Sequence, residues 1–276
     1  MVFKGVCLES ELLSRIRVPA QNATVYNTRI QKGGALIEEM RQLVRCWHEG
    51  RTEEITNSVI RSNVLNKTTR ARAADILRRT FIPRFVDGTP RNAWRLIRPL
   101  EDQNASPQLV KPLYYWISAK AEPLIFDFCQ EYLLHRLRSA RAGITVEDVR
   151  VWLVGKGCEW SPGVTTRVAR GLLAAFRDFG ILEGRSQKRL ASFILPVGSF
   201  AYLAFCLHRE GALGRNLVFH PDWHLFLLQT PGVEHYFLEA HQRRLIAYHA
   251  AGSTINISFP CEKLEDYARV VVERSN

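Results

Sequence analysis

The sequence predicts a mainly α-helical protein: an N-terminal helical bundle, a region resembling a winged helix-turn-helix, and a small C-terminal α+β segment. Three observations lead to this fold class. Apolar residues recur at helical spacing along most of the chain, residues 144–194 read as two helices and a hairpin, and residues 245–259 alternate as strands do. We expect an N-terminal extension at 1–25, a basic helical domain at 26–119, and a C-terminal domain at 120–276.

The N-terminal half is predicted to be a succession of helices. In residues 26–49, Ala35, Met40, Leu43 and Trp47 have helical spacing, and Gly33-Gly34 is interpreted as a helix entry rather than an anion site. Further helices are expected at 52–64, 67–85 and 93–100, with Pro83 ending or kinking the helix at 67–85. The aromatic run at 113–117 is predicted to be core, because it lacks the alternation of a base-stacking sheet.

A long apolar helix at 122–139 leads into the stretch 144–194. Thr145 can cap the next helix, with Asp148 completing a capping box, and Gly157 breaks that helix. Ser161-Pro162 then starts the following helix as its cap and first residue.

The helix at 161–179 has two distinct sides. One apolar stripe contains Val164, Val168, Leu172, Ala175, Phe176 and Phe179, and the opposite side contains Thr166, Arg167, Arg170, Ala174 and Arg177. Gly180 ends the helix. Residues 181–182 and 190–195 are expected to pair as short strands, with 183–189 as a basic turn.

The remaining chain is predicted to be helical, with one hairpin. We expect a buried helix at 196–210, helices at 220–228 and 230–244, strands around Ala251-Gly252-Ser253 within 245–259, and a closing helix at 263–273.

The charge of the chain is strongly basic and unevenly distributed. The 276 residues include 38 Lys and Arg against 27 Asp and Glu, a formal net charge of +11. Residues 61–99 hold ten cations and two acids, and residues 136–189 hold eleven cations and five acids, so the rest of the chain is slightly acidic. This segregation favours a polyanionic partner, with nucleic acid preferred to an anionic membrane surface.

The two basic stretches contain the side chains that we expect to contact duplex DNA. They are Thr166, Arg167, Arg170, Arg177, Arg185, Gln187, Lys188 and Arg189 in the later stretch, and Lys67, Arg72 and Arg79 in the earlier one. Such cations contact phosphates, and the second helix of a helix-turn-helix enters a groove. Three other interpretations stay open: solvated arginine faces with internal ion pairs, RNA binding through 61–98, and an adaptor for acidic protein partners.

No enzyme motif is present. The sequence lacks a GxxxxGK[ST] phosphate loop, a GxSxG motif and a dinucleotide fingerprint. His220 and His224 have a metal-binding spacing without further ligands, so we expect no metal and no cofactor. Asp222 and Glu239 would serve a nuclease only if the fold gathered them. We predict a non-enzymatic protein.

Cysteine spacing and hydropathy predict a cytoplasmic protein with no membrane partner. The six cysteines are irregularly spaced, which is typical of free thiols in a reducing compartment. The longest uncharged apolar stretch, 190–207, contains Pro196 and Gly198 near its middle and would span a bilayer poorly.

Several short motifs, in this order, resemble the BrxA family of bacteriophage-exclusion (BREX) defence systems. They are Tyr26–Ile30 with Lys32–Glu39, Lys67–Arg78, Arg167–Leu173 with Phe179–Gly184, His220–Trp223, Glu239–His241 and His249–Ser253. The resemblance runs from about Tyr26 to Tyr267, and residues 1–25 depart from it.

The resemblance implies a small, largely helical bacterial protein that is encoded with a methyltransferase and ATPases, which mark self DNA and exclude phage. Duplex DNA is the expected ligand and other BREX proteins are the expected partners. Members have been likened to an RNA-binding antitermination factor, which keeps the RNA alternative open. The resemblance brings no catalytic residues. An older family label suggests an inner-membrane protein, against which the hydropathy argues.

Overall fold

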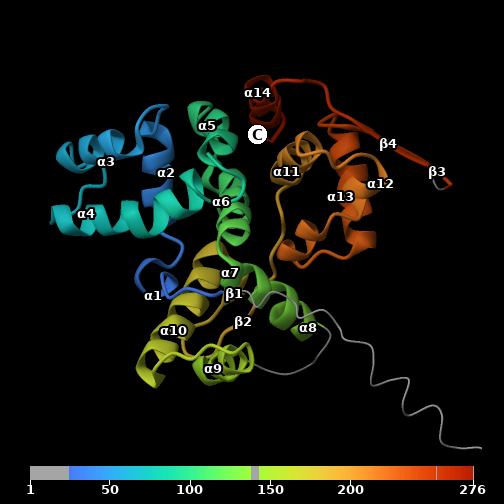
Figure 1. Cartoon of the computed structure of the whole chain (residues 1–276). Coiled ribbons are helices and arrows are strands. Elements are labelled where there is room, and N and C mark those ends of the chain that lie inside the picture. Colours follow the sequence, from blue (N-terminus) through green and yellow to red (C-terminus); the bar gives the residue numbers. More distant parts are fainter. Residues whose placement is uncertain (1–24, 138–142, 253, 276) are drawn as a thin grey trace, which may run out of the picture.

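The computed structural model describes residues 25–137, 143–252 and 254–275, so residues 1–24 of the predicted extension lie outside it. The described chain is mainly helical and has two small two-stranded sheets. Figure 1 shows the first four helices on the left, α5 to α8 in the centre, α9 and α10 below, and the C-terminal helices on the right.

The N-terminal half contains the elements α1 (Ile30–Gly33), α2 (Ile37–Cys46), α3 (Thr52–Arg61), α4 (Arg70–Ile76), η1 (Leu77–Val86), α5 (Trp94–Asp102) and α6 (Pro107–Ala121). The helix expected to begin at Gly33-Gly34 is confirmed as α2, and the short helix α1 before it was not predicted. The chain turns between them through positive φ angles of 46° at Gly34 and 48° at Leu36. Leu36 has a side chain and is strained in this region, so helical spacing alone could not reveal the break.

Pro83 does not end the helix predicted at 67–85. The chain passes from α4 into η1, a π-helix that contains Pro83 and continues to Val86. Proline lacks a backbone N–H and its ring clashes with the preceding turn of an α-helix. The wider π turn accommodates the ring, and π-helical segments within α-helices are rare enough that helical periodicity does not indicate them.

Helix α6 is the centre of the packing. Ser106 caps its N-terminus, and its aromatic run Leu113–Ile117 is buried, which confirms the prediction of a core segment. Helix α6 contacts α2, α5, α7, η1, α10, α11 and η3. The Tyr115 hydroxyl donates to the carbonyl oxygen of Leu225 at 3.0 Å, so α6 also ties the C-terminal part to the core.

The middle of the chain forms α7 (Pro123–Asp127), η2 (Phe128–Leu133), α8 (Leu134–Arg136), α9 (Val146–Gly155), α10 (Pro162–Phe179), β1 (Leu182–Glu183) and β2 (Arg189–Leu190). The π-helix η2 joins α7 to α8, so a helical path runs through most of the stretch predicted at 122–139. Residues 138–142 lie outside the described residues.

The C-terminal part forms α11 (Val197–Arg209), α12 (Arg215–Val218), η3 (Pro221–Phe226), α13 (Thr230–Gln242), β3 (Ala247–Ala251), β4 (Thr254–Ser258) and α14 (Leu264–Ser275). The helix predicted at 220–228 forms as η3, which is a short 3₁₀ helix. The hairpin predicted within 245–259 is confirmed, with Tyr248 opposite Ile257. Helix α14 packs on α5 and α11, which brings the end of the described chain back to the N-terminal half.

Part of the basic stretch 61–99 is structural. The Arg84 side chain is 1% exposed and lies 3.5 Å from the Glu122 carboxylate, and it donates to the carbonyl oxygen of Gly34 at 3.0 Å. Burial lowers the pKa of Arg84, and the Glu122 charge opposes that shift. Arg98 donates to the carbonyl oxygens of Val44 and Trp47 at the end of α2. The internal-pairing interpretation therefore holds for these two arginines.

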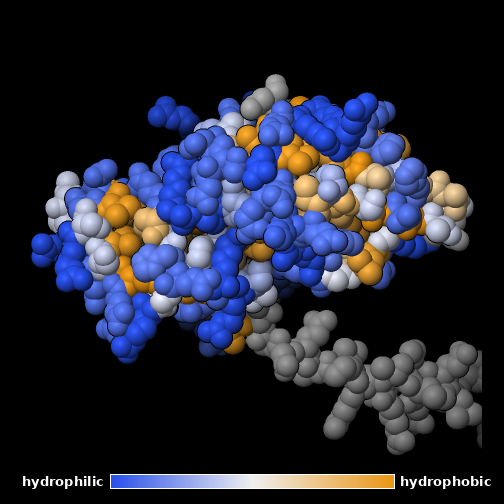
Figure 2. Space-filling view, turned by 90° about the horizontal axis from the view of Figure 1, so that it is seen from above, coloured by the Kyte–Doolittle hydropathy of each residue, from blue (hydrophilic) through white to orange (hydrophobic). Residues whose placement is uncertain are grey.

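The surface is mostly hydrophilic on the face that Figure 2 shows, with apolar side chains in separate patches. No helix in the described ranges is long and apolar enough to cross a bilayer. The cysteines that the structure describes are free thiols.

Candidate nucleic-acid interface

Helix α10 is the main element of the candidate interface, and its sequence explains its bounds. Pro162 is at its first turn, and Gly180 ends it with a left-handed φ of 85°. Val168, Leu172 and Phe176 are buried, with relative exposures of 0% each, as the apolar stripe predicted. Arg167, Arg170 and Arg177 are exposed on the other side. The predicted division of α10 into a core side and a cationic side is confirmed.

Helix α9 packs against α10 and is anchored at its start. Thr145 and Asp148 form the predicted capping box, in which the Thr145 hydroxyl accepts from the Asp148 N–H at 3.2 Å and Asp148 accepts from the Thr145 N–H at 2.7 Å. Thr145 is thus a fixed start for α9, and α9 packs against α10.

A short hairpin follows α10, and it is smaller than predicted. Its ladder pairs Leu182 with Leu190 and Glu183 with Arg189, so the strand expected over 190–195 ends at Leu190. Arg189, expected in the turn, is in the ladder, and its Nε donates to Glu183 at 2.6 Å. Lys188 also bridges to Ile144, which precedes α9. The hairpin is therefore tied to both helices.

The Lys188 ammonium, expected to contact phosphate, is directed into the hairpin turn. The residue is 6% exposed, and its Nζ donates to the carbonyl oxygens of Gly184 at 2.5 Å and Arg185 at 2.7 Å. Burial and the neighbouring Arg177 charge lower the pKa of Lys188. Arg185 and Gln187 are exposed around this turn. Lys188 therefore organises the turn, and the exposed side chains beside it remain the candidate contacts.

Replacing Lys188 by Met is expected to lower the free energy of unfolding by about 1–2 kcal/mol, because two charge-assisted hydrogen bonds to the turn are lost. Urea denaturation would measure the change. The matched control is Arg185→Met, an exposed neighbour whose substitution should cost less than about 0.5 kcal/mol. Equal effects of the two substitutions would contradict the structural role of Lys188.

The earlier predicted contacts lie on and before α4 and η1. Arg72 and Arg79 both pair with Asp75, at 3.6 and 2.5 Å, as their shared helix face predicted. The Lys67 ammonium lies 2.8 Å from Glu39. The Arg72 and Arg79 side chains stay 42% and 54% exposed, so these ion pairs leave both guanidinium groups accessible to solvent.

Helix α1 lies between the two predicted surfaces and joins them. A Cβ at Gly171 of α10 would lie 2.5 Å from the carbonyl oxygen of Ile30, so the two backbones are in close contact. On the other side of α1, a Cβ at Gly33 would lie 2.7 Å from Thr80 Oγ1 of η1. Arg72 also donates to the carbonyl oxygen of Lys32 at 3.4 Å. In Figure 1, α4, α1 and α10 follow one another from top to bottom on the left.

Two exposed cations on and beside α1, Arg29 and Lys32, belong to this region and were missed by the sequence analysis. The available signal was the lysine before Gly33-Gly34, which we interpreted as a simple helix entry. We call the cations on these adjoining elements the basic band: Arg167, Arg170 and Arg177 of α10, Arg185 of the hairpin, Arg29 and Lys32 at α1, and Arg72 and Arg79 of α4 and η1.

The predicted contacts of the later stretch differ in how many of their polar atoms are already bonded within the protein. The Thr166 hydroxyl donates to the carbonyl oxygen of Pro162 at 2.8 Å, within the helix. Arg189 is paired with Glu183, as described above. Arg177 bonds to Asp178 through both Nε and Nη2. Among the α10 arginines in the described chain, Arg170 has no hydrogen bond or ion pair.

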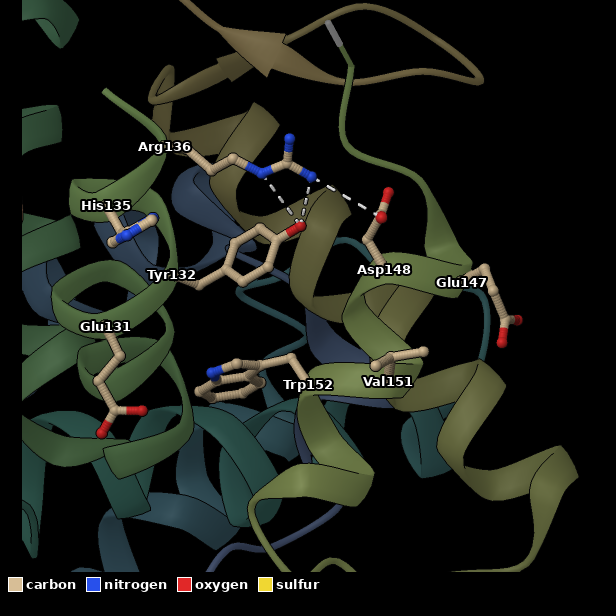
Figure 3. Close-up of a pocket in the computed structure, with 8 residues that line it drawn as sticks. All are labelled: Glu131, Tyr132, His135, Arg136, Glu147, Asp148, Val151 and Trp152. Atoms are coloured by element: carbon tan, nitrogen blue, oxygen red, sulfur yellow. Dashed lines mark hydrogen bonds and ion pairs between the residues drawn. The ribbon is translucent and has the colours of Figure 1, made fainter. Parts of the chain in front are cut away.

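A groove next to the start of α9 is different in character. It encloses about 660 Å³ between η2–α8 and α9, and is lined by Glu131, Tyr132, His135, Arg136, Glu147, Asp148, Val151 and Trp152. Figure 3 shows Arg136 reaching toward both the Tyr132 hydroxyl, at 2.7 Å, and the Asp148 carboxylate, at 3.7 Å. Its acids and aromatic rings do not suit phosphate, so we place no nucleic acid there.

The residues considered for metal or nuclease chemistry are not brought together. The His220 ring accepts from the Asp222 N–H at 3.2 Å and caps η3, as a capping histidine would. Asp222 accepts from the Trp116 indole at 2.7 Å and lies 3.2 Å from Lys120, while Glu239 pairs with Arg243. The part of the chain that the structure describes has no group of three or more potential metal ligands.

Comparisons with known proteins agree with this picture of the fold. A family model described as BrxA matches residues 24–205, so the motifs at 220–253 lie beyond the matched residues. A crystal structure of an uncharacterized protein from Magnetospirillum magneticum is similar, with a TM-score of 0.53 and 17% identity over 67% of this chain and 94% of that chain. At this identity the similarity concerns the fold alone. The search of curated proteins found no match.

Proposed function

The chain belongs to the BrxA family, which implies a component of a BREX phage-defence system, and on that premise we propose that it is a non-enzymatic protein that binds duplex DNA. Helices α9 and α10 with the hairpin would act as a winged helix-turn-helix. Helix α10 would lie in or along a groove, and the hairpin turn would contact a flanking phosphate.

The observation that carries the proposal is the basic band. Exposed cations of α10, α1, α4 and η1 lie on elements that contact one another through Gly171, Ile30 and Thr80. Cations on adjoining elements suit the regularly spaced phosphates of a duplex. Unrelated surface arginines would not be expected to lie on elements that adjoin one helix as short as α1.

The winged form is supported by how the hairpin is attached. The backbone of Lys188 exchanges hydrogen bonds with Ile144, at 2.5 and 2.9 Å, so the segment before α9 adds to the hairpin edge. Helix, helix and hairpin are then held as one unit, and the turn at Arg185 lies at the end of α10. A wing that contacts DNA beside a recognition helix needs this proximity.

Binding to duplex DNA is expected to be strongly salt-dependent. Each phosphate contact should make the slope of log K against log salt concentration more negative by about 0.9, because bound counterions are released. Fluorescence anisotropy with a labelled duplex of about 20 base pairs, at several salt concentrations, would measure this slope. The double variant Arg29→Ala/Lys32→Ala should weaken binding and make the slope less negative. The change should correspond to the loss of about one to two phosphate contacts.

The matched control is Lys263→Ala, an exposed lysine next to α14, outside the basic band. It should leave both affinity and slope unchanged within error. A flat salt response of the unaltered protein would contradict the proposal. Structured RNA and unlabelled duplex serve as competitors for the labelled duplex. If the RNA displaces the labelled duplex at a concentration equal to or lower than that of the unlabelled duplex, the result favours RNA binding over duplex-DNA binding.

A further inference from the structure

The side chain of Arg167 is held in a defined position at the N-terminal end of α10. Its Nε donates to the Oε1 atom of Gln31 at 3.1 Å. Its Nη1 lies over Gly163, where an added Cβ would be 3.6 Å away. In the described chain, no hydrogen bond or ion pair engages Nη1 or Nη2. The outer edge of the guanidinium is therefore exposed and oriented at the same time.

The backbone of the residue that orients Arg167 is itself held by packing. Gln31 belongs to α1, and its Cα would lie 3.0 Å from a Cβ at Gly171, so α1 and α10 are in backbone contact at this point. Its neighbour Ile30 is 3% exposed. Gln31 is uncharged, so it holds the guanidinium without neutralising it. An arginine held this way loses less side-chain entropy on binding.

Arg167 differs in this respect from the other arginines of α10. The Arg177 guanidinium uses both Nε and Nη2 on Asp178, which occupies one edge of it and compensates its charge. Arg170, with no partner in the described chain, is suited to a phosphate but is not oriented for a base. Of the three, only Arg167 combines a bound Nε with an unengaged outer edge.

We propose that Arg167 recognises guanine in the major groove, and that Gln31 is the residue that positions it. The proposal rests on the proposed duplex-DNA function. Two parallel N–H donors of a guanidinium match the N7 and O6 acceptors of guanine, and the N-terminal residues of a recognition helix reach the base edges. Such a forked contact could not be positioned from local patterns, because Gln31 and Arg167 are far apart along the chain.

The test compares binding of the full chain to alternating dG-dC and dA-dT duplexes of equal length. The unaltered protein should prefer the dG-dC duplex about tenfold. Arg167→Lys keeps the charge but loses the planar fork, so it should abolish the preference and leave the salt slope unchanged. Gln31→Leu should reduce the preference for the dG-dC duplex. Gln31→Glu keeps an acceptor oxygen for the Arg167 Nε and should therefore show a stronger preference than Gln31→Leu. Arg170→Lys is the matched control and should retain it.

Modified bases identify the groove. Replacing guanine by 7-deazaguanine removes the N7 acceptor and should lower affinity, whereas inosine removes only the minor-groove amino group and should not. Salt-sensitive binding without a dG-dC preference, or a preference that survives Arg167→Lys, would overturn the role of Arg167 and leave duplex binding intact. Failure of the unaltered protein to bind either duplex would overturn the proposed function itself.

Discussion

Reversing the charges of Arg170, Arg177 and Arg185 together is expected to abolish detectable binding to duplex DNA while the protein stays folded. These exposed side chains belong to the basic band, on α10 and on the hairpin turn. Each replacement by Glu removes a proposed phosphate contact and adds a charge that repels phosphates. Three such changes should weaken binding on the order of a thousandfold at moderate salt. Lys188 is left unchanged because its ammonium is bound within the turn.

Anisotropy and mobility-shift titrations would measure the loss, and circular dichroism with urea denaturation would show that the fold is retained. The matched control reverses three cations of the C-terminal helices and their approaches, Arg243, Lys263 and Arg269, which are exposed and lie outside the basic band. This control changes the net charge equally but should weaken binding far less. Equal losses in both triple variants would show that overall charge, and not the basic band, determines binding.

Removing the Glu101 carboxylate is expected to cause the largest loss of stability among simple substitutions of charged residues. Its side chain is fully buried and accepts from the Arg41 Nε at 2.8 Å, from the Arg45 Nε at 2.8 Å and from the Tyr114 hydroxyl at 3.0 Å. The hydrogen bond to Glu101 raises the pKa of Arg41, although burial opposes it. Glu101→Gln leaves a buried guanidinium without its counter-charge, which costs about 3–5 kcal/mol.

Urea denaturation of the full chain would measure this free energy. The control is Glu38→Gln, because Glu38 lies 4.0 Å from the same Arg41 but its side chain is 74% exposed. An exposed ion pair contributes about 0–1 kcal/mol, so the control should unfold almost as the unaltered protein does. If both substitutions cost the same, burial of the Arg41–Glu101 pair would not be the source of its stabilising effect.

Local sequence signals predicted the elements around α10 well, because each depends on residues close together in the chain. The Thr145 capping box, the proline start and glycine end of α10, and its apolar stripe all involve spacings of a few residues. The division of α10 into a buried and a cationic side follows from helical geometry alone. The hairpin after it was predicted in place but with a second strand that is too long.

The errors arise where helical and strand periodicity carry no information about a backbone conformation or a side-chain contact. The break between α1 and α2 places Leu36 in a left-handed conformation that local spacing does not predict. The burial of Arg84 depends on Glu122, which follows it by 38 positions and joins it only in the folded chain. The side chain of Lys188 was expected outside, but the carbonyl oxygens of its own turn bind it.

Composition and local periodicity establish that the protein is mainly helical, that its charge is segregated, and which side of α10 is cationic. The order of its short motifs is the basis of the resemblance to BrxA. The position of α1 between the two basic regions and the contact of Gln31 with Arg167 arise from tertiary packing. Both depend on the backbone of Gly171 meeting Ile30, a contact between residues far apart in the chain. Packing of the whole core fixes such a contact, and no local pattern encodes it.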